Sequence, residues 1–374
     1  MKIAKRLLPL LLVVFALVGI GSHLQNRATV KAVITKELDA FKNPDSETAQ
    51  KYISYITLFP EASENSLNPT KAQDVISLIF RNFDYKILDI DVDKANHLAT
   101  AALRLTTLDA KALAKDFAVT KLESLILSAA GSGTQNTEEI SYSLDDYYHI
   151  FQTLLSENKY DTVKNTCSIT LQCTDTKNAV WEILYTSAFE NDLVGGLLTY
   201  LSDTDLLSPE ETLSVYFQTL LSMNLEEMGT FLGIESISSS SDTVKTEIAY
   251  ALAEQVHKYL NYEILTCTIH GYTATIDIEI TTFDSDSIIN SYQKDLENYL
   301  ATPEAVIDGS EKRYENSVTL LLDKIKNNES TYTSAITLSM INDGVSWKLN
   351  DSDHVLGSAI FGTLCTSPME DAIS

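Results

Sequence analysis

The chain has 374 residues, of which 44% are hydrophobic, and its formal net charge is −25 at pH 7. This hydrophobic content is that of a globular protein and excludes a disordered one, and the length suggests about two domains. A strongly acidic surface repels phosphate backbones, so we expect no nucleic-acid binding. The charge is compatible with cationic partners, and it also serves solubility alone.

Residues 1–22 are typical of a signal peptide or an N-terminal membrane anchor. Basic residues precede an apolar run at 7–20, which is short for a membrane span. Gly19 and Gly21 supply small residues where a signal peptidase could cut. No Cys follows the run to carry a lipid. We therefore expect an extracytoplasmic protein, secreted or anchored to the cell membrane only through this segment.

The first half begins with helical stretches and continues with two apolar-alternating runs. DIDVD (89–93) spaces its aspartates as a calcium loop does, but the positions that need Gly and Glu hold Lys94 and Thr100. The alternation instead predicts a half-buried strand. In the next run every second residue is apolar, which predicts the partner strand of a hairpin. Asp109 then follows as the predicted N-cap of a helix.

A polar loop at 131–139, a helix with Tyr148 and a second hairpin complete this half. The second hairpin contains SITLQ (168–172), and Trp181 lies on its return strand. We expect the chain to join the next half at 202–211, where Ser208, Pro209 and Glu211 have the order of an N-cap, a first helical residue and a capping box.

The second half repeats these elements in the same order. Seven segments match, including FDYKIL with LNYEIL (260–265) and LRLTTLD with IEITTFD (278–284), and the only two tryptophans, Trp181 and Trp347, fall at equivalent places. Tyr148 is matched with Tyr314, and SITLQ with AITLS (335–339). The sequence therefore predicts a duplication, with repeat 1 at 27–205 and repeat 2 at 208–366.

Local signals in the second half agree with those in the first. Ile276, Ile278 and Ile280 share one strand face, and His270-Gly271 lies where a turn is needed. Asp284 is the predicted N-cap that matches Asp109. Asn342-Asp343-Gly344 predicts the turn of the last hairpin.

Each half therefore has helices followed by two antiparallel hairpins with more helix between them, which predicts an α+β class. This order resembles the NTF2-like (cystatin-like) fold, in which helices cradle a curved antiparallel sheet, and its tandem versions in bacterial cell-surface or secreted proteins of unknown function. The resemblance implies a conical cavity in each repeat. Relatives use that cavity for binding, or for enzymes such as isomerases.

No motif for catalysis or metal binding emerges from the residues. The six histidines are scattered, and the cysteines Cys167, Cys173, Cys267 and Cys365 form no zinc pattern. Cys167 and Cys173 would lie about 20 Å apart on one strand, too far for a disulfide, and we expect small buried residues. A Cys267–Cys365 pair stays open. We assign no catalytic, cofactor-binding or metal-binding residue and expect no cofactor.

The two tryptophans could line a ligand cavity, but large aromatics also fill the space between sheet and helix, and we favour packing. The leading hypothesis is an exported, non-enzymatic binding or scaffolding protein for an unknown extracytoplasmic ligand or protein. The alternative is an enzyme of the isomerase or dehydratase type in one cavity, which needs a buried carboxylate of raised pKa.

Overall fold

The computed structural model describes residues 26–42, 69–132, 143–157, 159–231, 243–350 and 355–364. Residues 1–22, Cys365 and the polar stretch 133–140 lie outside these ranges. Contacts divide the chain into two compact units, 1–117 with 141–203, and 118–140 with 204–374. The predicted boundary at 205–208 lies beside the division at 203/204, and residues 118–140 group with the second unit.

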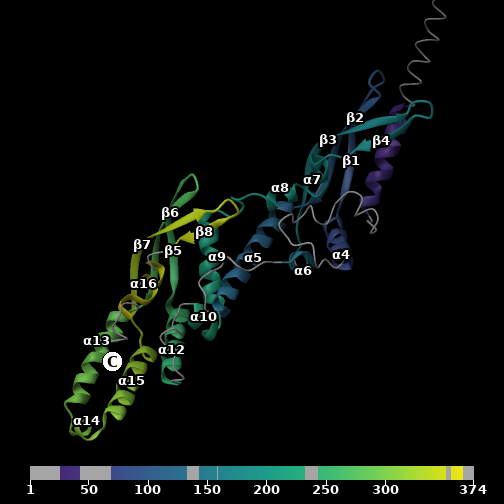
Figure 1. The fold of residues 1–374 in the computed structure, drawn as a ribbon. Coiled ribbons are helices and arrows are strands. Elements are labelled where there is room, and N and C mark those ends of the chain that lie inside the picture. The colour runs from purple at the N-terminus through teal and green to yellow at the C-terminus, as the bar shows by residue number, and fades with distance from the viewer. Residues whose placement is uncertain are drawn as a thin grey trace, which may run out of the picture. The chain divides into compact units, whose positions relative to one another are not determined.

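The first unit is an α+β structure around one four-stranded antiparallel sheet, in the order β1-β2-β3-β4 (Figure 1). Its strands are β1 Asp84–Asp93, β2 Leu98–Leu108, β3 Thr162–Asp175 and β4 Val180–Leu184. Its helical segments are 26–39, η1 Ala40–Lys42, α4 Pro69–Ile79, the start of α5 Ala110–Ser132, α6 Leu144–Glu157, α7 Ser187–Leu193 and α8 Leu197–Leu201.

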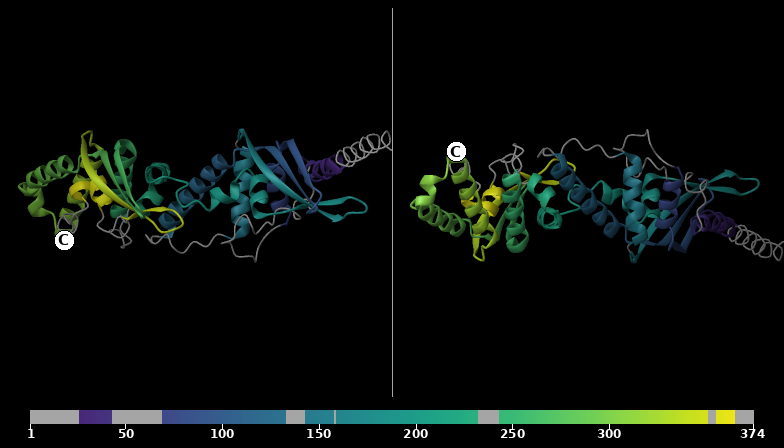
Figure 2. Two further views of the ribbon diagram at one scale, coloured as in Figure 1. Left: turned by 90° about the horizontal axis from the view of Figure 1, so that it is seen from above. Right: turned by 90° about the horizontal axis from the view of Figure 1, so that it is seen from below.

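The second unit has the same sheet order, β5-β6-β7-β8. Its strands are β5 Asn261–His270, β6 Thr273–Phe283, β7 Thr331–Asn342 and β8 Trp347–Asn350. Its helices are α9 Pro209–Ser222, α10 Leu225–Phe231, α12 Thr243–Tyr259, α13 Ser285–Leu300, α14 Pro303–Ile307, α15 Ser310–Lys326, α16 Val355–Phe361 and η4 Gly362–Leu364. In the first unit α7 packs against β2 and β3. In the second unit α9, α12 and α16 pack against the sheet, whereas α13, α14 and α15 extend past its end (Figure 2).

Alternating burial produces this layering. Along β2 and β6 every second side chain is buried, so one face of each sheet packs on the core and the other meets solvent. Phe41 is fully buried beside Phe80, with ring centroids 5.0 Å apart. In the second unit Ile276, Ile278 and Ile280 are fully buried, as the alternation predicts.

Most of the predicted turns, strands and caps within the described ranges are confirmed. DIDVD belongs to strand β1, and the Gly271–Tyr272 turn joins β5 to β6. The backbone N–H of Glu211 donates to Ser208 Oγ, and the Glu211 carboxylate accepts from the Ser208 N–H, so the capping box is complete. The final hairpin turns at 343–346, after Asn342.

The two predicted N-caps are also confirmed, and they share a second contact. The Asp109 carboxylate accepts from the N–H of Ala112 at 3.1 Å, and that of Asp284 accepts from Ser287 at 2.9 Å. The N–H of Asp109 also donates to the carbonyl of Asp161 at 2.8 Å, directly before β3. The N–H of Asp284 donates to Ser330 at 3.0 Å, directly before β7. These contacts support the predicted duplication.

The sheets share finer features too. The β1–β2 register shifts between Ile87 and Asp89, and the β5–β6 register shifts at the matching place, between Ile264 and Thr266. Each such shift is a β-bulge of one extra residue. Trp181 pairs with Cys173, and Trp347 with Asn342, at the start of the last strand of each sheet. Both tryptophans are buried, at 6% and 3% exposure.

Two of the sequence matches are out of register. Ala101 pairs with Ile169 and the matching Ile276 pairs with Leu338, so Ile169 corresponds to Leu338 and not to Ile336. Tyr148 is fully buried on α6, whereas Tyr314 on α15 is only partly buried. The burial pattern along the two helices instead matches Tyr148 with Val318, one turn further on.

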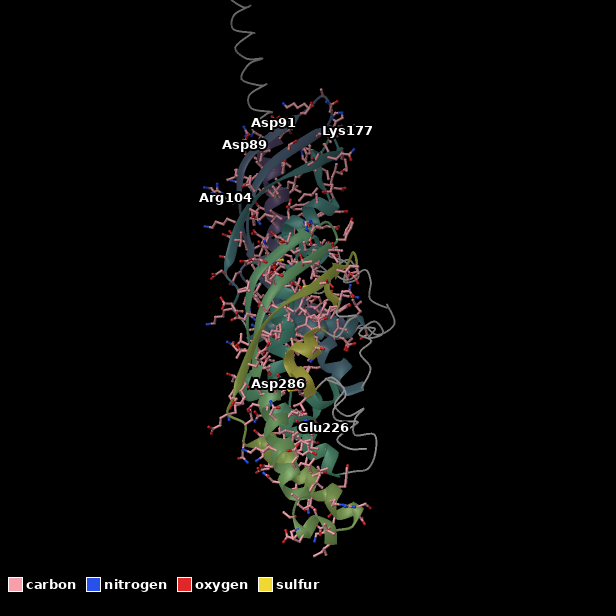
Figure 3. The ribbon with its side chains drawn as sticks, turned by 90° about the vertical axis from the view of Figure 1, so that its left-hand side faces the viewer. Asp89, Asp91, Arg104, Lys177, Glu226 and Asp286 are labelled. Atoms are coloured by element: carbon pink, nitrogen blue, oxygen red, sulfur yellow. The ribbon has the colours of Figure 1, made fainter. Side chains whose placement is uncertain are left out.

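Acidic side chains are spread over both units. Asp89 and Asp91 in the first unit, and Glu226 and Asp286 in the second, are labelled in Figure 3. Within the described ranges, no helix is both long and apolar enough to cross a membrane. Cys167 and Cys173 lie on the same strand as free thiols, as predicted, and Cys267 is also free. The three side chains are only partly buried, so the expectation that they are small buried residues is wrong.

Candidate ligand pocket of the second unit

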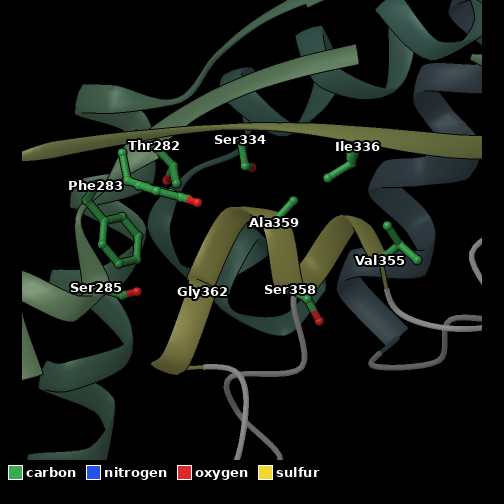
Figure 4. Close-up of a pocket in the computed structure, with 10 residues that line it drawn as sticks. Thr282, Phe283, Ser285, Ser334, Ile336, Val355, Ser358, Ala359 and Gly362 are labelled. Carbon is green, nitrogen blue, oxygen red and sulfur yellow. The ribbon is translucent and has the colours of Figure 1, made fainter. Parts of the chain in front are cut away.

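A pocket opens between the inner face of the second sheet and helix α16. Its volume is about 370 Å³, which falls within the usual range for ligand sites. Strands β6 and β7 form its ceiling and α16 its floor (Figure 4). The lining residues are Thr282, Phe283, Ser285, Tyr332, Ser334, Ile336, Val355, Ser358, Ala359 and Gly362.

Two hydrogen bonds fix one end of the pocket, one from the end of β6 to α16 and one between the start of α13 and η4. Thr282 Oγ1 donates to the carbonyl of Ile360 at 2.9 Å. Ser285 Oγ accepts from the N–H of Thr363 at 3.2 Å. Gly362 has φ +54°, and a Cβ there would collide with Ser285 Oγ, so this close approach requires glycine. The wall of the pocket at β6 and α13 is therefore fixed.

Ser334 is the exception among the buried hydroxyls of the lining. Its Oγ is buried and has no hydrogen-bond partner among the described residues. Ser334 pairs with Ile280, whose side chain is buried in the core, so Ser334 also points to the inner face. Figure 4 shows its side chain directed from β7 toward α16. A buried, unpaired hydroxyl costs free energy that a ligand's polar atom would recover.

The lining supplies hydroxyls and apolar groups and contains no carboxylate, imidazole, ammonium or guanidinium group. A charged ligand would lose its hydration here without gaining a counter-charge from the lining. The nearby carboxylates are used elsewhere. Asp284 caps α13, and Asp286 accepts from Thr363 Oγ1 at 2.9 Å. The site therefore suits a neutral ligand with an apolar body and one polar atom.

The corresponding place in the first unit has different chemistry. Cys167 pairs with Leu103 as Ile336 pairs with Ile278, so a thiol lies where the pocket has an isoleucine. Gly195 matches Gly362 as the left-handed residue that follows the first helix after the sheet, α7 in the first unit and α16 in the second. The φ of Gly195 is +70°, and a Cβ there would lie 2.7 Å from Thr107 Oγ1. Asp192 lies three residues before Gly195, and Ala359 lies three residues before Gly362, so the first unit has a carboxylate where the pocket has an alanine.

Burial changes the pKa of both Asp192 and Cys167. Burial raises the pKa of the Asp192 carboxyl. Burial, together with the charge of Asp192, raises the pKa of the Cys167 thiol to about 12. A raised pKa favours the protonated thiol over the thiolate, which is the nucleophilic form. Asp192 is one of two described carboxyls whose pKa burial raises, the other being Glu123 on α5, and sequence reasoning identified neither.

The tryptophans, which the sequence left open as cavity residues, are absent from this lining and are packed under the ends of the sheets. The pocket residues gave no sequence signal, because a strand with Ser334 in a Ser- and Thr-rich run resembles any polar strand. Of the histidines, His97 is a turn residue and His149 lies on α6, and the described residues contain no cluster that could hold a metal ion.

Comparisons with known proteins add little. No protein-family model and no curated protein matches the chain. Among solved structures, the chain is similar to the ycdA protein of Bacillus subtilis subsp. subtilis strain 168, a candidate lipoprotein, at 14% identity and a TM-score of 0.31. The match covers 74% of this chain and 96% of the other.

Proposed function

We propose that this is an exported cell-surface binding or scaffolding protein, and that the second unit binds a small neutral ligand in the pocket between β6, β7 and α16. The observation that carries the proposal is the buried Ser334 hydroxyl, which has no partner among the described residues, in a lining of hydroxyl and apolar side chains without a charged group. The leader at 1–22 supports export, and the acidic charge supports an exposed, soluble location.

We also propose that both units have the NTF2-like fold. The order of helices, hairpin, helices and hairpin in each unit supports this. In this proposal the second repeat keeps an open pocket beside its last helix. The first repeat has Asp192 and Cys167 at the matching positions.

The ligand proposal is tested with two probes that share a cyclohexyl ring, cyclohexanol and cyclohexanecarboxylate, by saturation-transfer NMR. Cyclohexanol should bind the wild-type chain, and the carboxylate should not. Ser334→Ala should weaken cyclohexanol binding about five- to tenfold, the worth of one hydrogen bond of about 1 kcal/mol. Ala359→Leu should abolish it by filling the pocket.

Ala335→Leu is the matched control, because Ala335 lies on the same strand but is exposed on the opposite face. It should leave binding unchanged. Absence of cyclohexanol binding to the wild type, or equal binding by the Ala359→Leu and Ala335→Leu variants, contradicts the proposal.

A second candidate function is catalysis of the isomerase or dehydratase type in the first unit. The raised pKa of Asp192 favours it, since a general base needs a carboxyl whose pKa lies above the ordinary value. The test is a pH titration of the Asp192 carboxyl by ¹³C NMR, with Asp192→Asn to assign the signal. A pKa near the usual value of about 3.9 removes the support for this candidate.

A further inference from the structure

The first strand of each sheet lies at the sheet's edge, but the two edge strands differ in charge. Strands β1 and β5 each pair with one neighbour among the described residues. The outward-facing residues of β1 after its bulge are Asp89, Asp91 and Asp93. At the matching positions β5 has Thr266, Thr268 and His270.

Edge strands expose unpaired backbone groups, and charged side chains are one way to prevent another strand from adding to them. The aspartates of β1 serve this purpose, and Asp89 is also held by Arg27 at 2.6 Å. This accounts for the DIDVD alternation without a metal. Strand β5 lacks that protection and leaves Leu265 49% and Ile269 53% exposed.

The turn that follows β5 fixes which of its backbone groups are free. The two-residue turn Gly271–Tyr272 makes His270 and Thr273 a hydrogen-bonded pair. Because such pairs alternate along an antiparallel ladder, the N–H and C=O groups of Thr268 face β6. Those of Cys267 and Ile269 then point away from the sheet and are free to pair.

We propose that β5 is an interaction edge at which a second copy of this chain adds its own β5, antiparallel, over Thr266–His270. The two-fold axis passes between Thr268 and the second copy's Thr268. Cys267 then lies opposite Ile269 of the second copy, and about four backbone hydrogen bonds form between these residues. Thr266 lies opposite His270, and the two sheets become one.

A second copy fits this edge because the segment is complementary to itself. The register brings hydroxyl groups together and places no two like charges opposite each other. The same register on β1 would place Asp91 opposite Asp91 and Asp89 opposite Asp93, which repel. Only five residues pair, so the interface is small, and the net charge of −25 opposes association at low salt. Weak, salt-dependent dimerisation is the expected behaviour.

Sedimentation velocity on the chain purified from a secreting host tests this, in 0.5 M NaCl over rising protein concentration. The wild type should dimerise, and Thr268→Asp should raise the dimer dissociation constant more than tenfold. Ser339→Asp makes the same charge change on β7, away from the edge, and should leave the constant unchanged. A wild type that stays monomeric, or equal effects of the two variants, overturns the proposal.

A disulfide trap gives an independent readout for a weak dimer. At a non-hydrogen-bonded pair the Cα atoms lie about 4.5 Å apart, within the range for a disulfide of about 4.4–6.8 Å. In a chain whose four native cysteines are replaced by serine, Thr268→Cys should form a covalent dimer in a glutathione buffer. Asp91→Cys, at the matching position of β1, should stay monomeric. Equal trapping at both positions, or none at Thr268→Cys, contradicts the pairing.

Discussion

The indole N–H of Trp347 donates a hydrogen bond of 2.9 Å to Oδ1 of Asp205, ahead of helix α9. The same oxygen accepts from Asn342 Nδ2 at 3.2 Å. The matching Trp181 is equally buried, but its N–H has no partner among the described residues. The two tryptophans thus share a place in the sheet and differ in the polar contact beneath it.

Replacing Asp205 by alanine should destabilise the second unit by about 1–3 kcal/mol, because the Trp347 N–H loses its acceptor, whereas Asn342 Nδ2 keeps the carbonyl of Thr204 at 3.1 Å. Urea unfolding followed by far-UV circular dichroism measures this and the two Trp→Phe variants, because each of those variants loses the only tryptophan of its unit. Trp347→Phe should cost about 1–2 kcal/mol, whereas Trp181→Phe should be neutral or slightly stabilising, since it removes an unpaired donor. Equal costs for the two Trp→Phe variants would sink this interpretation.

The helix caps at Asp109 and Asp284 should contribute similar amounts. Alanine at either position removes the side-chain acceptor of a helix N–H and should cost about 1 kcal/mol. Asn at the same positions keeps the acceptor and should recover most of the loss. Urea midpoints of the four variants decide the matter, and an Asn variant as unstable as its Ala counterpart would contradict the capping role.

Two hairpin turns contain a non-glycine residue with positive φ, His97 at +56° and Ala179 at +52°. Each follows a turn in which an aspartate, Asp93 or Asp175, accepts from the N–H of the residue three positions later, at 3.2 Å in both turns. Ala179→Gly should stabilise the first unit by about 0.5–1 kcal/mol, because glycine adopts this conformation without the Cβ strain. Calorimetry of this variant beside Lys177→Gly, at a neighbouring turn position, gives the comparison. A lower melting temperature for Ala179→Gly is the contrary result.

Acid sensitivity should involve the final hairpin. Burial alone would raise the pKa of Asp343, but hydrogen bonds from Lys348 and from the N–H groups of Ser346 and Val345 outweigh it and lower this pKa to about 2. A folded-state pKa below the unfolded value of about 3.9 stabilises the fold above pH 4, and this stabilisation is lost as the pH falls toward 2.

The side chain of Asp343 is partly exposed, so we expect a contribution of about 1 kcal/mol. Asp343→Asn should flatten this part of the stability profile between pH 4 and pH 2. Unfolding free energies of the variant and the wild type across this interval provide the measurement, and parallel profiles would exclude the assigned role.

Much of the fold could be predicted because its local signals agree with its packing. The capping box at Ser208, the turn at Gly271 and the alternating isoleucines of β6 each depend on near neighbours, and each is confirmed. The matching of the halves was less secure. A shift of two residues along a strand, or four along a helix, preserves the buried face. Sequence pattern therefore could not separate Ile336 from Leu338 as the counterpart of Ile169.

The pocket could not be predicted for a different reason. It is formed by β6 and β7 with a helix that starts 24 residues after β7 begins, at Val355 against Thr331. The hydrogen bond from Thr282 to Ile360 beside it spans 78 positions. Whether Ser334 has a partner depends on these distant neighbours. Period and composition carry no information about such contacts.

Helix α5 begins at Ala110 in the first unit, yet its residues from 118 onward group with the second unit, and Ile126 is fully buried in that unit's core. In sequence, then, the second unit is discontinuous. A fragment that begins near residue 205 would lack the part of α5 whose Ile126 is buried in the core of the second unit. The predicted repeats and the folded units therefore have different boundaries, because residues 118–140 of the first repeat belong to the second unit.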